Sequence, residues 1–561
     1  MTTRSVAELA DRYVERFAAL DPCMAALMGI AGQDARLTDY SPDGVAARTD
    51  LARRTLAELT EVPVTGERER VAAAVLRDRL ETDLALDEAH AREAVLDTTD
   101  GPVQRLKYAF ELLDQGERTD WASLLGRLRA LPAAVEGLRA GLDHAAQHGR
   151  LPARRQIARS IADARTAPAY LTALAARHTP RSSPRDGGQD GGQDGPGHQE
   201  LTDAARAAAR AFQDLADHLA TALAPRAHEH DAVGPDRYRL GVRDNLGTTL
   251  DLHDTYAWGW EELARVETEM ARAAAQISPG TPVEAVRHAL DRDPAHRVTG
   301  AAAFRDWIQR LADRTIDALD GAHFDIPAPL RRVECRIPPG QAGVYYLAPA
   351  EDGSRPGTVW WTAAPHDDIA TWTVPGILFH ETAPGHHLQL GTTTFHPGLN
   401  RFQRTASELH PGHCEGWGLY AERLMDELGH YRDPAHRFGM LAGGQQFRAA
   451  RVVLDIGLHL RLPIPAGTGF HEGERWTPEL AREFLRAHTG SETDASLAFE
   501  IDRYLGRPGQ AIAYKLGEKV WLEARDAARR RDGAAFDLKD FHRRALDLGP
   551  MGLDRLRAEL A

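Results

Sequence analysis

The sequence has few cysteines, no excess of positive charge and no long apolar runs, and each shortage excludes a class of protein. Three scattered cysteines are too few for a disulfide framework or a thiolate metal site, which suits a reducing compartment. A net charge of −14 without a basic patch argues against nucleic acid as a partner. Neither a signal peptide nor an apolar run of about eighteen residues is present. We expect a cytoplasmic globular protein with no membrane partner.

Helical periodicity covers most of the 561 residues, so the fold class is predicted to be mostly α. Residues 1–178 and 201–330 are expected to form one helical domain. The Gly-, Asp- and Gln-rich stretch 179–200 is predicted to be a disordered insertion in that domain, and a linker is the alternative. β-branched and aromatic runs at 343–347 and 358–362 predict a small antiparallel hairpin. The remaining region, 331–561, carries the candidate chemistry.

The stretch FHETAPGHHLQ, residues 379–389, resembles an interrupted zinc-binding motif. His380 and Glu381 begin the pattern H-E-x-x-H, but Pro384 occupies the place of the second histidine. On a continuous helix His386 would point about 120° away from His380, and His387 would lie about 10.5 Å further along the axis. Pro384 and the glycine after it predict a helix break that could return one histidine to His380. We expect His386 to return, since it directly follows the break; a helix end with surface histidines is the alternative.

A second helix is predicted at residues 413–428 and carries two glutamates on one face. Glu415 is a candidate third ligand, in the arrangement of the gluzincin peptidases. Glu422 lies seven residues later and could orient a ligand from behind. A solvated acid is the alternative interpretation of Glu422.

Four blocks of the sequence together resemble a known family: HETAPGHHLQ, EGWGLYAE, DIGLH and RPGQAIAYKLG. They are similar to the hallmark blocks of the bacterial "domain of unknown function 885" family. That family is thought to be related to helical zinc peptidases such as thimet oligopeptidase, angiotensin-converting enzyme and carboxypeptidase Taq. The resemblance implies a two-lobed, multi-helix gluzincin-like fold with the hairpin beside the metal helix. It also implies His380, His386 and Glu415 as metal ligands and Glu381 as general base. His387 belongs to the motif and ranks behind His386 as a ligand, and the choice between the two histidines stays open.

Two further groups of polar residues are candidates for substrate binding or catalysis. Arg451, Asp455 and His459 recur every four residues on an apolar helix, which a solvated face would also explain. The resemblance favours His459 as a donor to the oxyanion. The second group could stabilise a tetrahedral intermediate or pair with a substrate carboxylate, although capping and core packing explain it too. It contains Tyr504, Tyr514, Arg503 and Lys515, with Tyr514 the preferred tyrosine.

The sequence therefore predicts a hydrolase for short peptides or peptide-like amides, with one Zn²⁺ or another divalent metal as cofactor. Glu381 would remove a proton from the attacking water, and His459 or Tyr514 would stabilise the oxyanion. Two alternatives stay open: a metal-dependent lyase or amidase for a small natural product, and a helical scaffold without activity. Side-chain preference, exo- or endo-cleavage and oligomeric state do not follow from the sequence.

Overall fold

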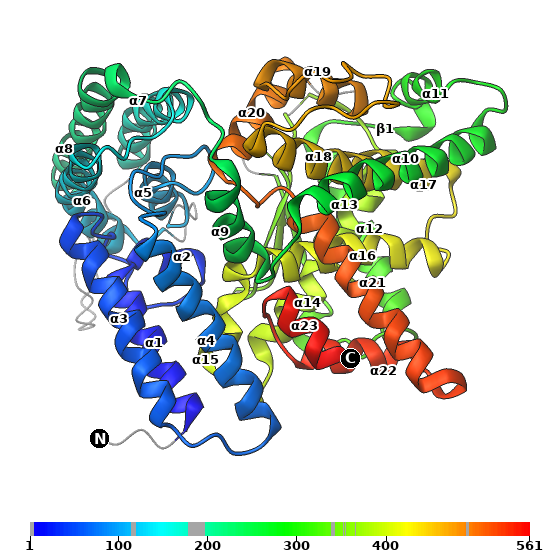
Figure 1. Ribbon diagram of the computed structural model, residues 1–561, viewed down its shortest axis with the longest axis horizontal. Coiled ribbons are helices and arrows are strands. Elements are labelled where there is room, and N and C mark those ends of the chain that lie inside the picture. Colours follow the sequence, from blue (N-terminus) through cyan, green and yellow to red (C-terminus); the bar gives the residue numbers. More distant parts are fainter. Residues whose placement is uncertain are drawn as a thin grey trace, which may run out of the picture. The chain divides into compact units, whose positions relative to one another are not determined.

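The chain is mostly helical, as predicted, and divides into two compact units (Figure 1). The structure is a computed structural model. It describes residues 5–113, 119–177, 197–337, 343–351, 353, 355–364, 366–489 and 493–561. Among these residues no helix is both long and apolar enough to cross a membrane.

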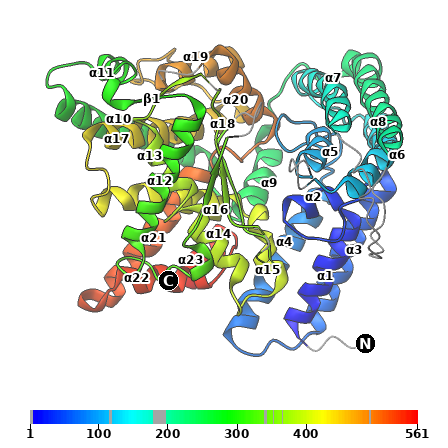
Figure 2. The ribbon, with the colours of Figure 1, turned by 180° about the vertical axis from the view of Figure 1, so that it is seen from behind.

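The first unit comprises Met1–Pro63 and Leu80–Asp231. Helix α8 packs along both α6 and α7 (Figure 1 and Figure 2), around a core of mainly leucine, alanine and phenylalanine side chains. The aspartate before α6 caps that helix by accepting hydrogen bonds from the amides of Ala122 and Ser123. The helical elements are α1 (Val6–Leu20), α2 (Pro22–Leu27), α3 (Pro42–Glu61), α5 (Pro102–Glu111), α6 (Trp121–Gln147), α7 (Arg154–Ala176), α8 (His198–His218), η2 (Leu219–Leu223) and η3 (Ala224–Arg226).

The second unit comprises Val64–Arg79 and Ala232–Ala561, so helix α4 (Glu67–Glu88) belongs to both units. Its further helical elements are α9 (Gly234–Leu246), α10 (Leu252–Ile277), α11 (Val283–Leu290), η4 (Pro294–His296), α12 (Ala301–Leu319), η5 (Ala328–Leu330), α13 (Val374–Glu381), α14 (His386–Phe395), α15 (Arg401–Thr405), η6 (Ala406–Leu409), α16 (Pro411–Glu427), α17 (Pro434–Gly439), η7 (Met440–Gln446), α18 (Phe447–Leu460), α19 (Pro478–Thr489), α20 (Asp494–Gly506), α21 (Ala513–Asp532), η8 (Gly533–Ala535), α22 (Leu538–Asp547) and α23 (Leu553–Leu560).

Two small sheets complete the second unit. Strands β3 (Tyr345–Leu347) and β4 (Thr358–Trp360) pair antiparallel with Tyr346 opposite Val359, which confirms the predicted hairpin. Strand β2 (Glu334–Arg336) pairs parallel to β4 on its other edge. Strands β1 (Arg297–Thr299) and β5 (Asp368–Ala370) form a separate antiparallel pair just before α13.

The units do not follow the predicted boundary at residue 331. The long segment of the second unit begins at Ala232, because α9 and α10 pack on α18. Tyr238 on α9, for example, donates a 2.7 Å hydrogen bond to Asp455 on α18. Most of the predicted insertion lies outside the described residues, and α8 begins at His198.

Helices α16 and α21 cross at very short distance, and this crossing positions the candidate site. A Cβ atom on Gly416 would lie 2.4 Å from the backbone of Gly517, and one on Gly517 would lie 2.1 Å from the carbonyl oxygen of Gly412. Both distances are far below van der Waals contact. Glycine at these positions therefore lets the backbones meet, with Glu415 beside the crossing.

Candidate metal centre

The chain breaks between α13 and α14 at the predicted Pro-Gly step. Helix α13 ends at Glu381 and α14 begins at His386. The backbone turns so tightly that a Cβ atom on Gly385 would lie 1.9 Å from the carbonyl oxygen of His380. Trp417 on α16 donates a 2.8 Å hydrogen bond from its indole nitrogen to the carbonyl of Pro384. Glycine and the indole donor together fix the break that the interrupted motif predicted.

The break brings His380, His386 and Glu415 together. Their potential ligand atoms all lie within 4.8 Å of one another. The Nε2 atoms of His380 and His386 lie 3.2 Å and 3.5 Å from the same carboxylate oxygen of Glu415. In a tetrahedral zinc site with bonds of about 2.0–2.1 Å, ligand atoms are separated by about 3.3–3.4 Å. The two distances from the histidines to Glu415 therefore fit zinc coordination.

Glu422 lies directly behind His380. The Nδ1 atom of His380 donates a 2.9 Å hydrogen bond to Glu422, whose side chain is only 2% exposed. The alternative interpretation of Glu422 as a solvated acid is therefore wrong. A carboxylate on Nδ1 fixes the ring and leaves Nε2 free for a metal ion. Burial lowers the pKa of His380, but hydrogen bonds with Glu415 and Glu422 outweigh it and raise the pKa to about 10.

Two glycines make room for this histidine–glutamate pair. A Cβ atom on Gly418 would lie 2.6 Å from Cε1 and Nε2 of His380, so the imidazole rests directly on the α16 backbone. A Cβ atom on Gly444, in the π-helical turn η7, would lie 1.9 Å from a carboxylate oxygen of Glu422. Four consecutive residues of α16 thus build the site. Glu415 is a candidate ligand, and Gly416 lets α21 approach. Trp417 holds the helix break, and Gly418 leaves room for the ring of His380.

Glu381 is buried beside the cluster and one of its oxygens, Oε2, has no hydrogen-bond partner among the described residues. Burial raises the pKa of Glu381, while His386 and His380 act in the opposite direction. A buried carboxylate oxygen without a partner is costly unless a water or ion contacts it. This orphaned oxygen is consistent with a catalytic water held next to the three donors.

Tyr514 on α21 lies near His380, with ring centroids 6.3 Å apart. Burial is the main cause that raises the Tyr514 pKa, and the nearby Glu415 adds to it. The guanidinium groups of Arg448 and Arg451 lie 5.4 Å and 5.0 Å from the tyrosine ring centroid. Sequence reasoning missed Arg448, which also affects the pKa of Glu381. The sequence carried one signal for Arg448: it lies one helical turn before Arg451, and therefore on the same face of α18.

His387 points away from the cluster. Its Nε2 donates to the carbonyl of Leu330 at 2.9 Å, and its Nδ1 lies 3.0 Å from the hydroxyl of Tyr346 on strand β3. Burial lowers the pKa of His387 to about 4, so the ring is neutral. This geometry favours His386 over His387 as the neighbour of His380, and His387 instead connects α14 to the hairpin.

Arg451, Tyr504 and Arg503 form a network around Glu500 that ends near Tyr514. Arg451 donates to the Tyr504 hydroxyl at 3.0 Å and to Glu500 at 2.9 Å. Tyr504 and Arg503 donate to the same Glu500 oxygen at 2.6 Å and 2.8 Å. Since Tyr504 already donates its hydroxyl proton inside the protein, Tyr514 is the better placed tyrosine.

Two candidates on α18 have partners inside the protein that do not fit the predicted roles. The Nε2 of His459 donates to the carbonyl of Tyr504 at 3.0 Å, so this nitrogen is not available to an oxyanion. Asp455 accepts from Tyr238 at 2.7 Å and from the amide of Gly509 at 2.9 Å. The polar stripe of α18 is thus buried at these positions and is not a solvated face.

Lys515 is likewise enclosed. Its ammonium group donates to Glu262, Gln445 and Glu518 at 2.5–2.6 Å and is 1% exposed. All three ammonium protons are used. The predicted pairing of Lys515 with a substrate carboxylate therefore does not fit its surroundings.

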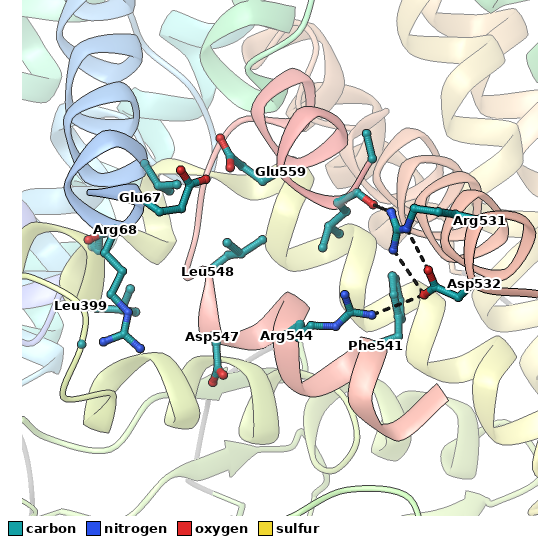
Figure 3. A pocket seen from close by; sticks show the side chains of 15 residues that line it. Glu67, Arg68, Leu399, Arg531, Asp532, Phe541, Arg544, Asp547, Leu548 and Glu559 are labelled. Atoms are coloured by element: carbon teal, nitrogen blue, oxygen red, sulfur yellow. Dashed lines mark hydrogen bonds and ion pairs between the residues drawn. The ribbon is translucent and has the colours of Figure 1, made fainter. Parts of the chain in front are cut away.

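A cavity of about 490 Å³ lies elsewhere in the second unit and contains none of the candidate residues (Figure 3). Arg531 and Arg544 line it, and both reach Asp532, at 2.9 Å and 3.7 Å. Each guanidinium group thus already pairs with a carboxylate, and Arg544 also pairs with Asp540 at 3.0 Å. This cavity does not compete with the histidine cluster as the site of chemistry.

Comparison with known families and structures agrees with the sequence blocks. A model described as "Bacterial protein of unknown function (DUF885)" matches residues 22–560. The chain belongs to the DUF885 family. A comparison with curated proteins found no match.

Two solved structures are similar to this DUF885 protein over nearly its whole length. One is the crystal structure of "the putative lipoprotein from Colwellia psychrerythraea", with a TM-score of 0.80 and 21% identity, covering 100% of this chain and 99% of that one. The other is "a putative lipoprotein of unknown function from Shewanella oneidensis", with a TM-score of 0.73 and 17% identity, covering 99% of both chains. At this identity the likeness shows a shared fold.

Proposed function

We propose that this DUF885 protein is a zinc-dependent hydrolase that cleaves amide bonds of short peptides or peptide-like substrates. The observation that carries the proposal is the joining of three donors, His380, His386 and Glu415, with the orphaned carboxylate of Glu381 at their side. Two imidazoles and a carboxylate with a free position for water form the ligand set of hydrolytic zinc sites. The relation to gluzincin peptidases and their two-lobed fold is part of this proposal.

Each neighbouring side chain has a place in the proposed reaction. A zinc ion held by the three donors would lower the pKa of a bound water and polarise the scissile carbonyl. Glu381 accepts the proton of the attacking water and later delivers it to the leaving nitrogen. Tyr514 donates a hydrogen bond toward the oxyanion, in place of His459. Glu422 holds the ring of His380 so that Nε2 faces the ion.

Arg448 and Arg451 supply positive charge next to Tyr514. Arg451 donates hydrogen bonds to Glu500 and Tyr504, whereas among the described residues the side chain of Arg448 donates only to the backbone carbonyl of Gly443. Arg448 therefore takes the place of Lys515 as the candidate partner of a substrate carboxylate. The hairpin of β3 and β4 reaches α14 through His387 and could pair with an extended substrate.

Location in the cytoplasm also remains part of the proposal. It is supported by three cysteines that are free and buried. The titles of the two similar structures describe those proteins as lipoproteins, and comparing the cytoplasmic and membrane fractions of a tagged full-length chain would decide the question.

Glu381→Gln tests the reaction, because the amide keeps the size of the side chain but cannot accept the proton. We expect peptide cleavage by zinc-loaded protein to fall by about 10²- to 10⁴-fold while bound zinc is unchanged. The matched control is Glu334→Gln on strand β2, a partly exposed glutamate that pairs with Arg336. Equal rates for Glu381→Gln and wild type would refute the role. If wild type holds zinc but cleaves no member of a peptide library, the lyase or amidase alternative gains support.

A further inference from the structure

A second histidine–carboxylate cluster is built from two copies of one short sequence. The segment RDPAHR occurs at residues 292–297 and again at 432–437. In each copy the aspartate caps a helical turn, since Asp293 accepts from the amide of Ala295 at 3.0 Å and Asp433 from that of Ala435 at 2.8 Å. The proline follows the cap as the first helical residue, and the histidine comes three residues after the aspartate. Both copies thus fold into the same capped turn.

The two turns face each other although 140 residues separate them in sequence. His296 lies between both aspartates, with Nδ1 3.0 Å from Asp293 and Nε2 2.9 Å from Asp433. The ring of His436 meets the ring of His296 edge-on, with centroids 5.8 Å apart. Ligand atoms of His296, Asp433 and His436 all lie within 4.8 Å of one another. The cap bonds occupy one oxygen of each aspartate and leave the other directed at His296.

We propose that His296, Asp433 and His436 form a second binding site for Zn²⁺ or a similar late first-row divalent metal. Two imidazoles and one carboxylate suit zinc and exclude a preference for Mg²⁺ or Ca²⁺, which favour oxygen donors. Asp293 holds Nδ1 of His296, so Nε2 is the coordinating atom, as in the carboxylate–histidine–zinc arrangement. The side chain of Asp433 is 42% exposed, which gives an ion and its waters access from solvent.

The position of this second cluster connects it to helix α13. The carbonyl of His296 accepts a 2.8 Å hydrogen bond from the amide of Thr371, three residues before α13 begins. Helix α17, which carries His436, lies against the same segment: a Cβ atom on Gly439 would come 2.1 Å from the carbonyl of Trp372. A metal ion would therefore join the two elements that hold the start of the helix carrying His380. Its role is structural, and it needs no part in the reaction.

Zinc binding to the full-length protein after dialysis against a weak chelator tests this site. Equilibrium dialysis should give two ions for wild type, one for His436→Ala, one for Glu415→Ala and none for the double variant. Asp433→Asn should also lose the second ion, because asparagine keeps the helix cap but removes the anionic ligand. Asp293→Asn should weaken the second site by about 10- to 100-fold.

His471→Ala is the matched control. His471 also lies between two carboxylates, 3.0 Å from Glu474 and 3.2 Å from Glu483, but the described residues place no second histidine within ligand distance. It should bind as many ions as wild type. The proposal is overturned if His436→Ala and Asp433→Asn bind as much zinc as wild type, since the cluster would then be an ion-pair network only. A wild-type count of one that falls to zero in His436→Ala would support this site while refuting the buried one.

Discussion

The two histidine clusters use the same donors but are built in opposite ways. In each, a carboxylate holds Nδ1 of one histidine, Nε2 faces a second carboxylate, and another histidine stands nearby. The cluster at His380 is buried and assembled from a broken helix and a crossing helix. The cluster at His296 is partly exposed and made from two copies of one capped turn. Both clusters therefore need tertiary contacts, but the exposed one uses two simple capped turns, whereas the buried one needs a helix break and a close helix crossing.

Gly418→Ala should have the largest effect, because it breaks the buried cluster without touching a donor. The added methyl would lie 2.6 Å from the His380 ring and displace it from Glu415 and Glu422. We expect loss of zinc from this site and of all hydrolysis, while zinc bound at His296 persists. Zinc content and peptide cleavage measure both.

Gly443→Ala controls for the loss of a glycine, since its methyl would meet only Thr373, at 3.9 Å. Wild-type zinc content in Gly418→Ala would contradict this account, because zinc binding would then not depend on the contact between His380 and the α16 backbone.

His386→Ala and His387→Ala separate adjacent histidines that point in different directions. His386 faces Glu415 at 3.5 Å, whereas His387 contacts Leu330 and Tyr346. The first variant should lose zinc and activity together; the second should keep zinc and lose activity only in part, through a displaced hairpin. Atomic emission on dialysed protein distinguishes them. The reverse ranking of zinc contents would show that the ligands lie seven residues apart.

Asp455→Asn tests a third histidine–carboxylate pair, Asp455 with His459, which is buried but is not a candidate metal site. Asp455 lies 3.9 Å from His459, and burial raises its pKa from 3.8 to about 7. A carboxyl group with a raised folded-state pKa favours folding when protonated, so its contribution is lost as pH rises through about 7. The variant minus wild-type difference in unfolding free energy should therefore increase by about 4 kcal/mol between pH 4 and pH 8. Denaturant melts measure it, and a difference independent of pH would contradict the assignment.

Glu422→Gln should have the smallest effect. Glutamine still fits beside Gly444 and can accept from Nδ1 of His380, but it lacks the charge that strengthens His380 as a ligand. Zinc affinity at the buried cluster should fall by about 10- to 100-fold. Asp293→Asn provides the parallel change in the exposed cluster, so competition titrations with a chromophoric chelator can compare the two. If Glu422→Gln leaves the zinc affinity unchanged, the charge of Glu422 does not contribute to metal binding.

The sequence predicted the break and the hairpin because local rules suffice there, whereas the grouping of Glu415 with His380 and His386 followed from the resemblance to the family. Proline and glycine mark a break, and aromatic alternation marks strands. It could not assign Lys515 or His459, because the rotation of α21 and α18 about their axes is set by packing. Lys515 turns to Glu262, which lies far away in sequence. Gly418 and the repeated RDPAHR turns were overlooked, although the repeat is visible in the sequence itself.

The central claim is that His380, His386 and Glu415 hold one metal ion beside Glu381. Crystals of the full-length protein grown with zinc chloride, with diffraction measured on both sides of the zinc absorption edge, test it directly. We predict an anomalous peak at about 2.0–2.2 Å from Nε2 of His380, Nε2 of His386 and a carboxylate oxygen of Glu415. A folded protein with no peak among these three residues would contradict the account.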